Sequence, residues 1–259
     1  TTMFAIRRRD NSMESPSDNT GKTKPRRRTR AQVRAETERA RRRRIALIAG
    51  AVVVAVLVAG GLIWSNRSSS NLPSLHAADV AAFEGVPANG RVIGDPNAPV
   101  HLVEYGDYQC PACTDFNTKV FPQLLSDYIA TGKVSFEFTD LAFLGPDSIT
   151  AAEAVACSID QDGFWPYHET VFANHYGENL GNLSKSRLLK MAELANLDKD
   201  KISSCLSAGT TSAAVQNMHE EATQLGVTST PTFILNGDLL QWQGWDALKQ
   251  SLDAALANQ

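Results

Sequence analysis

Two cysteines three positions apart form the motif Cys110-Pro111-Ala112-Cys113, directly after an apolar run. Thiols at this spacing at the start of a helix can close a disulfide with each other and exchange it with another protein. The thiolate is the reactive form, and the unpaired N–H groups and dipole at a helix N-terminus favour it. We therefore predict that Cys110 is the attacking thiol. Cys113, one turn later and more buried, is predicted to be the resolving thiol.

The motif alone is also compatible with metal binding, because cysteine pairs serve zinc and copper sites. A zinc site using all four cysteines is disfavoured, since Cys157 and Cys205 are not a close chelating pair. The histidines at positions 76, 101, 175 and 219 show no ligand spacing. We expect no metal and no cofactor, and a CxxC metallochaperone stays open as an alternative.

The charge of the chain is unevenly distributed. Residues 1–44 carry thirteen Arg and two Lys against five acids, a net of +10, whereas residues 65–259 carry ten bases against twenty-three acids, a net of −13. Between them, Ile45 to Trp64 is twenty residues without a charge, and about 30 Å of helix crosses a bilayer core. Four arginines, Arg41 to Arg44, precede this stretch. The positive-inside rule then predicts a cytoplasmic N-terminus and an extracytoplasmic acidic part.

We predict that this transmembrane helix, 45–64, is retained as an anchor, because signal peptides have shorter apolar regions. The basic tail, 1–44, is predicted to be disordered and to bind no nucleic acid, since a basic run beside a span attracts anionic lipid. Residues 65–89 are predicted to be a linker. Four cysteines beyond the anchor are typical of an oxidising compartment.

The folded domain is predicted to occupy 90–259. Strands are expected at 100–105 and 133–143, with a helix over 111–130 between them. A helical segment is expected at about 148–225. Asn236-Gly237 between 231–235 and 239–242 predicts a hairpin, followed by a helix that buries Leu248, Leu252 and Leu256.

This order of elements resembles an α/β thioredoxin-like fold with a helical insertion, preceded here by one transmembrane helix. Three blocks are similar to the DsbA-like thiol–disulfide oxidoreductases, in the membrane-anchored form of Gram-positive bacteria. They are EYGDYQCPAC (104–113), GFWPYHETVF (163–172) and GVTSTPTFILNG (226–237).

The resemblance implies roles for further residues. Glu104 matches the family's buried acid, which accepts the proton of the resolving thiol, and a lone acid in an apolar strand is costly without a function. Thr230-Pro231 matches the cis-proline loop, which faces the CxxC and pairs with extended client segments. The dipeptide Pro111-Ala112 departs from the Pro-His of the best-studied oxidases, and this leaves the oxidising strength open.

Cys157 and Cys205, 48 residues apart, are interpreted as a structural disulfide that joins the ends of the insertion. A second redox relay and two free core thiols are the alternatives. Phe164, His168 and Phe172 recur at i+4 spacing and predict the core face of a helix rather than a client-binding surface. His168 is then a hydrogen-bonded core histidine.

We predict a monomeric, membrane-anchored enzyme that oxidises the thiols of unfolded secreted proteins. The resemblance implies a quinone-linked membrane partner that reoxidises it. A reductase, for example in cytochrome maturation, is the alternative within the class. A non-catalytic adaptor working through its basic tail is the alternative outside it.

Overall fold

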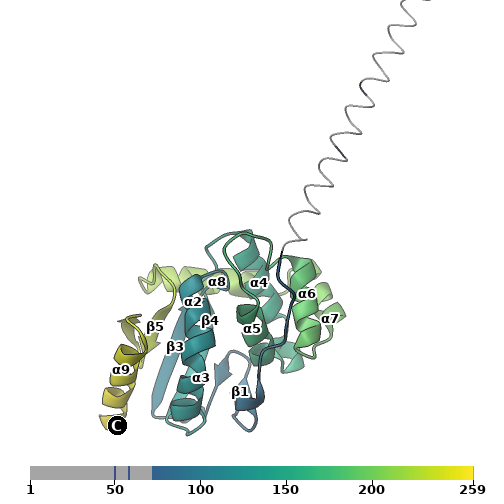
Figure 1. Cartoon of the computed structure of the whole chain (residues 1–259). Coiled ribbons are helices and arrows are strands. Elements are labelled where there is room, and N and C mark those ends of the chain that lie inside the picture. The colour runs from purple at the N-terminus through teal and green to yellow at the C-terminus, as the bar shows by residue number, and fades with distance from the viewer. Residues whose placement is uncertain (1–49, 51–57, 59–71, 259) are drawn as a thin grey trace, which may run out of the picture. The chain divides into compact units, whose positions relative to one another are not determined.

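The computed structural model describes Gly50, Val58 and residues 72–258 (Figure 1). Apart from Gly50 and Val58, the predicted basic tail and transmembrane span lie outside the described residues, as do residues 65–71 of the predicted linker. No helix in the described part of the chain is long and apolar enough to cross a membrane.

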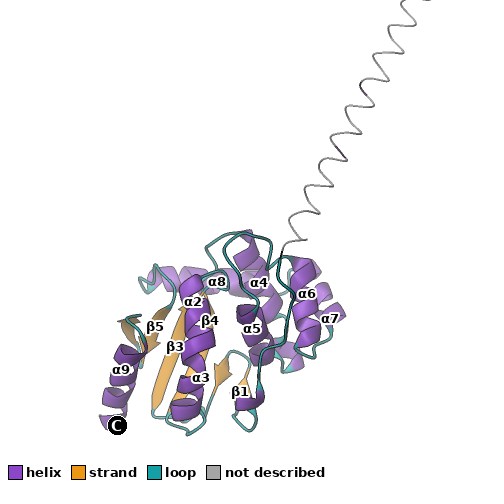
Figure 2. Cartoon of the chain, in the orientation of Figure 1, coloured by secondary structure: helices purple, strands orange, loops and turns teal. Residues whose placement is uncertain are grey.

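The described part of the chain contains strands and helices (Figure 2), and most of the helices follow one another between the fourth and fifth strands. The strands are β1 (Ala88–Asn89), β2 (Val92–Ile93), β3 (Val100–Gly106), β4 (Val134–Asp140), β5 (Thr232–Leu235) and β6 (Asp238–Gln241). The α-helices are α2 (Pro111–Asp115), α3 (Phe121–Leu124), α4 (Pro146–Ala156), α5 (Phe164–Ala173), α6 (Lys185–Leu194), α7 (Lys199–Ala208), α8 (Ser212–Gln224) and α9 (Trp245–Ala257). Short 3-10 turns are η1 (Ala81–Phe83) and η4 (Ile159–Gln161), and π-helical segments are η2 (Phe116–Val120) and η3 (Leu125–Ile129).

The described strands form one sheet in the order β1-β2-β4-β3-β5-β6. Strands β3 and β4 are parallel, with Val100 opposite Val134, and every other pair is antiparallel. The crossover from β3 to β4 runs through α2, η2, α3 and η3, because parallel neighbours need a long connection. Strands β1 and β2 were not predicted, since two-residue strands contain no readable alternation.

Helices cover both faces of this sheet. Leu102 of β3 faces the main core with Phe136, Phe233 and, from α9, Leu248. The next side chains along β3 point to the opposite face, where Tyr105 packs in a smaller cluster with residues after β4 and from α8. In Figure 1 the segment from α2 to α3 lies in front of β3 and β4. Cys113 and Phe116 belong to the same core cluster as Leu102, so the helix that carries the CxxC packs on the Leu102 face.

The predicted helix over 111–130 is divided by the two π-helical segments. Pro122 lies in the first turn of α3 and has no backbone N–H to donate to the preceding turn. The N–H of Phe121 bonds to the carbonyl of Phe116, an i→i+5 contact. π-Bulges occur frequently beside functional sites, and this one begins three residues after Cys113.

The predicted helical segment at 148–225 consists of α4, α5, α6, α7 and α8, joined by loops. The predicted hairpin is present as β5 and β6, with positive φ at Asn236 and Gly237. Positive φ at both turn residues matches the twist of the strands. In α9, Leu248 and Leu252 are buried, whereas Leu256 is only half-buried.

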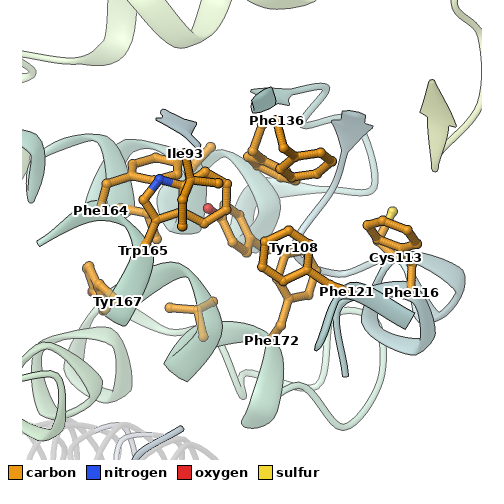
Figure 3. Packing of buried hydrophobic residues seen from close by; sticks show 14 of the residues in the cluster. Ile93, Tyr108, Cys113, Phe116, Phe121, Phe136, Phe164, Trp165, Tyr167 and Phe172 are labelled. Carbon is orange, nitrogen blue, oxygen red and sulfur yellow. The ribbon is translucent and has the colours of Figure 1, made fainter. Parts of the chain in front are cut away.

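Aromatic side chains fill the space between the sheet and the helical insertion (Figure 3). The rings of Phe121 and Trp165 stack at 5.6 Å between centroids, and Tyr108 lies 4.8 Å from Phe172. Full burial of such a side chain stabilises by about 1.5–3 kcal/mol. Cys113 lies beside Phe116 in this view, so the resolving thiol is part of the core.

Candidate active site

The CxxC motif lies at the junction of β3 and α2. Cys110 is the N-cap residue of α2, and Pro111 takes the first helical position, where a missing N–H breaks no helical bond. The N–H of Cys110 donates to the carbonyl of Asp107 at 3.0 Å. Both thiols are free. Cys110 is 6% exposed and Cys113 is 0% exposed, so the first thiol is at the edge of the core and the second is inside it.

The surroundings of Cys110 lower the pKa of its thiol from 9.0 to about 6. The hydrogen bond from the Cys113 thiol contributes most to this lower pKa. The Thr230 side chain and the backbone N–H groups of Cys113 and Ala112 act in the same direction, against partial burial. Those N–H groups are unpaired donors of the first helical turn. At neutral pH Cys110 is therefore a thiolate and a nucleophile.

The pKa of the Cys113 thiol is shifted in the opposite direction. Burial raises the pKa of its thiol well above the usual value, and the hydrogen bond to Cys110 and the charge of Glu104 raise it further. Cys113 thus stays protonated while Cys110 ionises. It needs a base before it can attack a mixed disulfide on Cys110.

Glu104 is the carboxyl group that we predicted to act as this base. It is fully buried on the same face of β3 as Leu102, between Phe138 of β4 and Phe233 of β5. No hydrogen bond to either carboxyl oxygen is made in the described part of the chain. Burial in this apolar setting raises the pKa of Glu104 well above its ordinary value. The charges of Glu169 and Cys110 raise this pKa further.

Asn117 interacts with both Glu104 and the resolving cysteine. Its amide lowers the pKa of Glu104 against these effects, although the geometry directs its hydrogen bonds to Cys113 and His168. The Nδ2 group donates to the carbonyl of Cys113 at 3.0 Å, and Oδ1 lies 3.0 Å from Nε2 of His168. The backbone of the resolving cysteine is thereby attached to a fully buried polar network.

His168 continues that network into the core, in agreement with the predicted core histidine. It is fully buried, and its Nδ1 lies 2.9 Å from the hydroxyl of Tyr108. Because Asn117 Oδ1 is an acceptor, Nε2 carries the proton and Nδ1 accepts from Tyr108. Burial lowers the pKa of His168 well below its usual value, so the ring is neutral.

The loop before β5 faces the attacking thiol. The Thr230–Pro231 peptide bond is cis, and the carbonyl oxygen of Thr230 lies 3.4 Å from Sγ of Cys110. Strand β5 is paired with β3, with Thr232 opposite Tyr105, and this pairing holds the loop at the end of β3. The structure thus brings Thr230-Pro231, about 120 positions later in the sequence, to the same place as Cys110, Cys113 and Glu104.

Cys157 and Cys205 lie in the helical insertion, not at this site. They form a disulfide with their Cα atoms 6.0 Å apart and a sequence separation of 48. Cys157 follows α4 directly and Cys205 lies in α7. The bond therefore joins two helices of the insertion.

Asp107 is an active-site-loop residue that the sequence analysis missed. Its Oδ1 accepts from the N–H of Gln109 at 2.8 Å and from the hydroxyl of Ser148 at 2.6 Å. Its Oδ2 accepts from the N–H groups of Phe143 and Leu144 at 2.9 and 3.1 Å. An Asp side chain that accepts from the backbone N–H two residues later is a known turn signal. The contacts to Phe143, Leu144 and Ser148, in contrast, leave no pattern in the sequence near Asp107. Asp107 holds the CxxC loop against the start of the insertion.

A redox-active thiol pair at the start of the helical segment that follows β3 in a thioredoxin-like fold defines the class of thiol–disulfide oxidoreductases. Comparison with known proteins supports this class and places the chain within it. The family model Thioredoxin_4, described as Thioredoxin, matches residues 87–254. The chain belongs to this family, and it is a DsbA-like thiol–disulfide oxidoreductase.

Two similar relatives come from Bacillus. The disulfide bond formation protein D of Bacillus subtilis (strain 168) is 31% identical over 178 residues, covering 64% of this chain and 76% of the relative. The probable disulfide bond formation protein D of Bacillus anthracis is 30% identical over 169 residues, covering 63% and 77%. Both alignments include more than half of this chain.

Solved structures show the same fold. Oxidised BdbD from Bacillus subtilis matches with a TM-score of 0.62 and 25% identity, covering 72% of this chain and 100% of that one. DsbA from Chlamydia trachomatis matches with a TM-score of 0.60 and 21% identity, covering 67% and 94%. The second likeness shows the fold alone.

Proposed function

We propose that this chain is an extracytoplasmic oxidase that forms disulfide bonds in secreted proteins through Cys110 and Cys113. The observation that carries the proposal is the contrast between the two thiols. An ionised Cys110 beside a buried, protonated Cys113 stabilises the reduced form of the enzyme, and a stabilised reduced form makes the disulfide a stronger oxidant. The Bacillus relatives, whose names describe disulfide bond formation, support the same direction.

The reaction follows from these positions. A client thiolate attacks Sγ of Cys110 in the oxidised enzyme, and Cys113 leaves as a thiolate that takes a proton from Glu104. A second client thiolate then attacks the client sulfur of the mixed disulfide and expels Cys110 as a thiolate. The client leaves with one disulfide, and the enzyme is reduced by two electrons. The backbone of Thr230 borders the attacking sulfur and is the edge on which an extended client segment pairs.

The proposed location rests on the sequence. The uncharged stretch 45–64 with arginines before it would anchor the enzyme with the catalytic part outside. A membrane partner that passes electrons to quinone would then reoxidise Cys110 and Cys113, with both proteins held in one membrane. A reporter enzyme that is active only outside the cytoplasm, fused after Gln259, tests this topology, and an inactive fusion contradicts it.

The reduction potential of Cys110–Cys113 tests the proposed direction. We would equilibrate the full chain in glutathione buffers and follow the CxxC by alkylation and mass spectrometry, with Cys157→Ala/Cys205→Ala as the control for the second disulfide. A potential at or above about −150 mV supports the oxidase, whereas a value near about −270 mV is that of a thioredoxin-like reductant. The second result would replace the oxidase with a reductase.

A further inference from the structure

Three buried polar side chains connect the two flanks of the CxxC motif. Tyr108 comes two residues before the attacking cysteine, and Asn117 comes four residues after the resolving one. His168 of α5 is bonded to both, with Nδ1 2.9 Å from the Tyr108 hydroxyl and Nε2 3.0 Å from Oδ1 of Asn117. Nδ2 of Asn117 donates to the carbonyl of Cys113 at 3.0 Å. The three side chains thus form a continuous hydrogen-bonded chain that ends on the backbone of the resolving cysteine.

The last acceptor of this chain determines the direction of every hydrogen bond in it. The Cys113 carbonyl can only accept, so Asn117 directs its NH2 group there and its Oδ1 toward His168. Nε2 of His168 then carries the proton, and Nδ1 accepts from Tyr108. Burial lowers the pKa of His168 well below its usual value and raises the pKa of Tyr108 well above its own. The ring is therefore neutral, and the Tyr108 hydroxyl stabilises the one tautomer that orients the Asn117 amide toward Cys113.

A side chain that bonds the carbonyl four residues earlier is by itself an ordinary feature of helices, and Thr114 makes the same contact to Cys110. Asn117 differs because its oxygen is also bonded, by a histidine from another element. Oε1 of Glu169 lies 3.9 Å from the same Nε2 of His168, which is too far for a hydrogen bond. The imidazole therefore donates to Asn117, and the amide has one preferred orientation.

The hydrogen-bonded chain is enclosed by the core. Asn117 and His168 are 0% exposed, and Tyr108 is 1% exposed. The imidazole of His168 lies 4.4 Å from the ring of Phe138 and 5.0 Å from the ring of Phe172. Because these groups are buried, solvent does not replace a broken bond, and a polar group left without its partner is costly. The chain therefore restrains the backbone of the resolving cysteine.

We propose that Tyr108 and His168 are positioning residues for disulfide exchange, which act through Asn117 and place the Cys113 thiol for its attack on Cys110. The inference rests on the proposed roles of the two cysteines and holds whether the enzyme oxidises or reduces its clients. Attack on a mixed disulfide needs the sulfur atoms at contact distance and in line, and misplacement by about 1 Å can slow such a step by about 100-fold. A hydrogen bond at the Cys113 carbonyl restrains its Cα, and with it the thiol.

The step that depends on this placement can be measured separately. The reduced full chain, purified in detergent with the Cys157–Cys205 disulfide intact, is mixed rapidly with oxidised glutathione at pH 8. The Cys110 thiolate attacks one glutathione sulfur, one glutathione thiolate leaves, and an adduct forms on Cys110. Cys113 then gives its proton to the Glu104 carboxylate and attacks Sγ of Cys110, which expels the second glutathione thiolate and leaves the enzyme oxidised by two electrons. Acid quenching and mass spectrometry give the rates of adduct formation and decay.

Two core tyrosines allow a matched comparison. Tyr108→Phe removes the hydroxyl that donates to His168 and keeps the packing of the ring. Tyr167→Phe removes an equally buried hydroxyl on the same helix as His168, whose hydrogen bond of 2.9 Å goes to the carbonyl of Leu188 in α6. Asn117→Ala removes the link to the resolving cysteine. The double variant Tyr108→Phe/Asn117→Ala tests whether Tyr108 acts through that link.

We expect adduct formation at the same rate in the wild type and all four variants, because Cys110, with a pKa of about 6, is ionised at pH 8. Adduct decay should be about tenfold slower in Tyr108→Phe, a part of the loss that a full 1 Å of misplacement can cause. Tyr167→Phe should decay like the wild type, although both tyrosine variants should lose a similar amount of melting temperature. Decay in the double variant should equal decay in Asn117→Ala, because Tyr108 has no further effect once the link is removed.

Three results would contradict the inference. Unchanged decay in Tyr108→Phe would overturn it, and equal slowing in Tyr167→Phe would show a general loosening of the core instead. Effects of Tyr108→Phe and Asn117→Ala that multiply in the double variant would show that Tyr108 does not act through Asn117.

A failure of the proposed function has a different signature, because no adduct would then form on Cys110 in the wild type. Circular dichroism confirms the fold of each variant. If Tyr108→Phe did not fold, Asn117→Ala would be compared with Tyr167→Phe, and equal decay in these two variants would overturn the inference.

Discussion

The Cys113 thiol should determine much of the acidity of Cys110, and replacing Cys113 tests this directly. The hydrogen bond from Cys113 is the largest effect that lowers the pKa of Cys110 to about 6. A hydrogen bond to a charged group contributes about 1.5–3 kcal/mol, which equals a pKa change of about 1–2. Water can replace part of this bond near the surface. We therefore expect the pKa of Cys110 to rise by about 1 in Cys113→Ala and to change little in Cys113→Ser, whose hydroxyl still donates.

The low pKa of Cys110 also determines by how much ionisation of this thiol stabilises the reduced enzyme. At pH 7 a thiol with a pKa of about 6 is about 90% ionised, against about 1% for a thiol at 9.0. The corresponding stabilisation of the reduced folded enzyme at pH 7 is about 1.4 kcal/mol, or about 30 mV of potential. Because the folded pKa lies below the ordinary one, this stabilisation is complete above about pH 9. It is lost as the pH falls through about 6.

The assay is the rate of iodoacetamide alkylation of Cys110 between pH 4 and 9, with the Cys157–Cys205 disulfide left intact. Since only the thiolate reacts, the midpoint of the rate profile gives the pKa. A wild-type midpoint near 9 would refute the thiolate reasoning altogether. A midpoint near 6 in Cys113→Ala would refute the assigned cause, because the helical N–H groups would then suffice.

Three further predictions concern the supporting residues. Replacing both Cys157 and Cys205 by Ala should lower the free energy of unfolding by about 2–4 kcal/mol in urea titrations, because it releases a constraint on the unfolded chain. The reduction potential of the CxxC pair should stay unchanged, and a shift in that potential would show a redox relay. Glu104→Gln should raise the melting temperature above wild type at pH 8 but not at pH 4. A carboxyl group whose pKa is raised in the folded protein costs stability only at a pH above its pKa in the unfolded chain. Equal melting temperatures at pH 8 would contradict the buried position. Asp107→Ala leaves buried donors unpaired and should cost about 1–3 kcal/mol, with faster hydrogen exchange in the CxxC loop as the readout and unchanged exchange as the contrary result.

Several elements could be predicted from the sequence because their causes are local. Alternation of apolar residues at Val134, Phe136 and Phe138 indicated a strand, and β4 is found there. Asn236-Gly237 indicated a hairpin turn because both residues tolerate positive φ. The spacing of Cys110 and Cys113 placed both at a helix start, where α2 begins. Each of these features depends on a few consecutive residues.

Other features depended on contacts between distant residues. The division of the helix over 111–130 into π-helical segments was not predicted, although Pro122 was visible. Three hydrogen bonds to Asp107 join the CxxC loop to the residues that follow β4, including Ser148, 41 positions later. No local pattern encodes such a pairing. The half-burial of Leu256 likewise follows from how α9 ends, not from its spacing.

By itself, the sequence determined which atoms can exchange disulfides, since only the two thiols of the CxxC pair have the required spacing at a helix start. The tertiary structure decided how those thiols differ. Phe138 and Phe233 come from β4 and β5, and only the sheet register places them on either side of Glu104. Thr230 reaches Cys110 across 120 positions of sequence. A pKa depends on burial and neighbouring charge, and both are properties of residues brought together by folding.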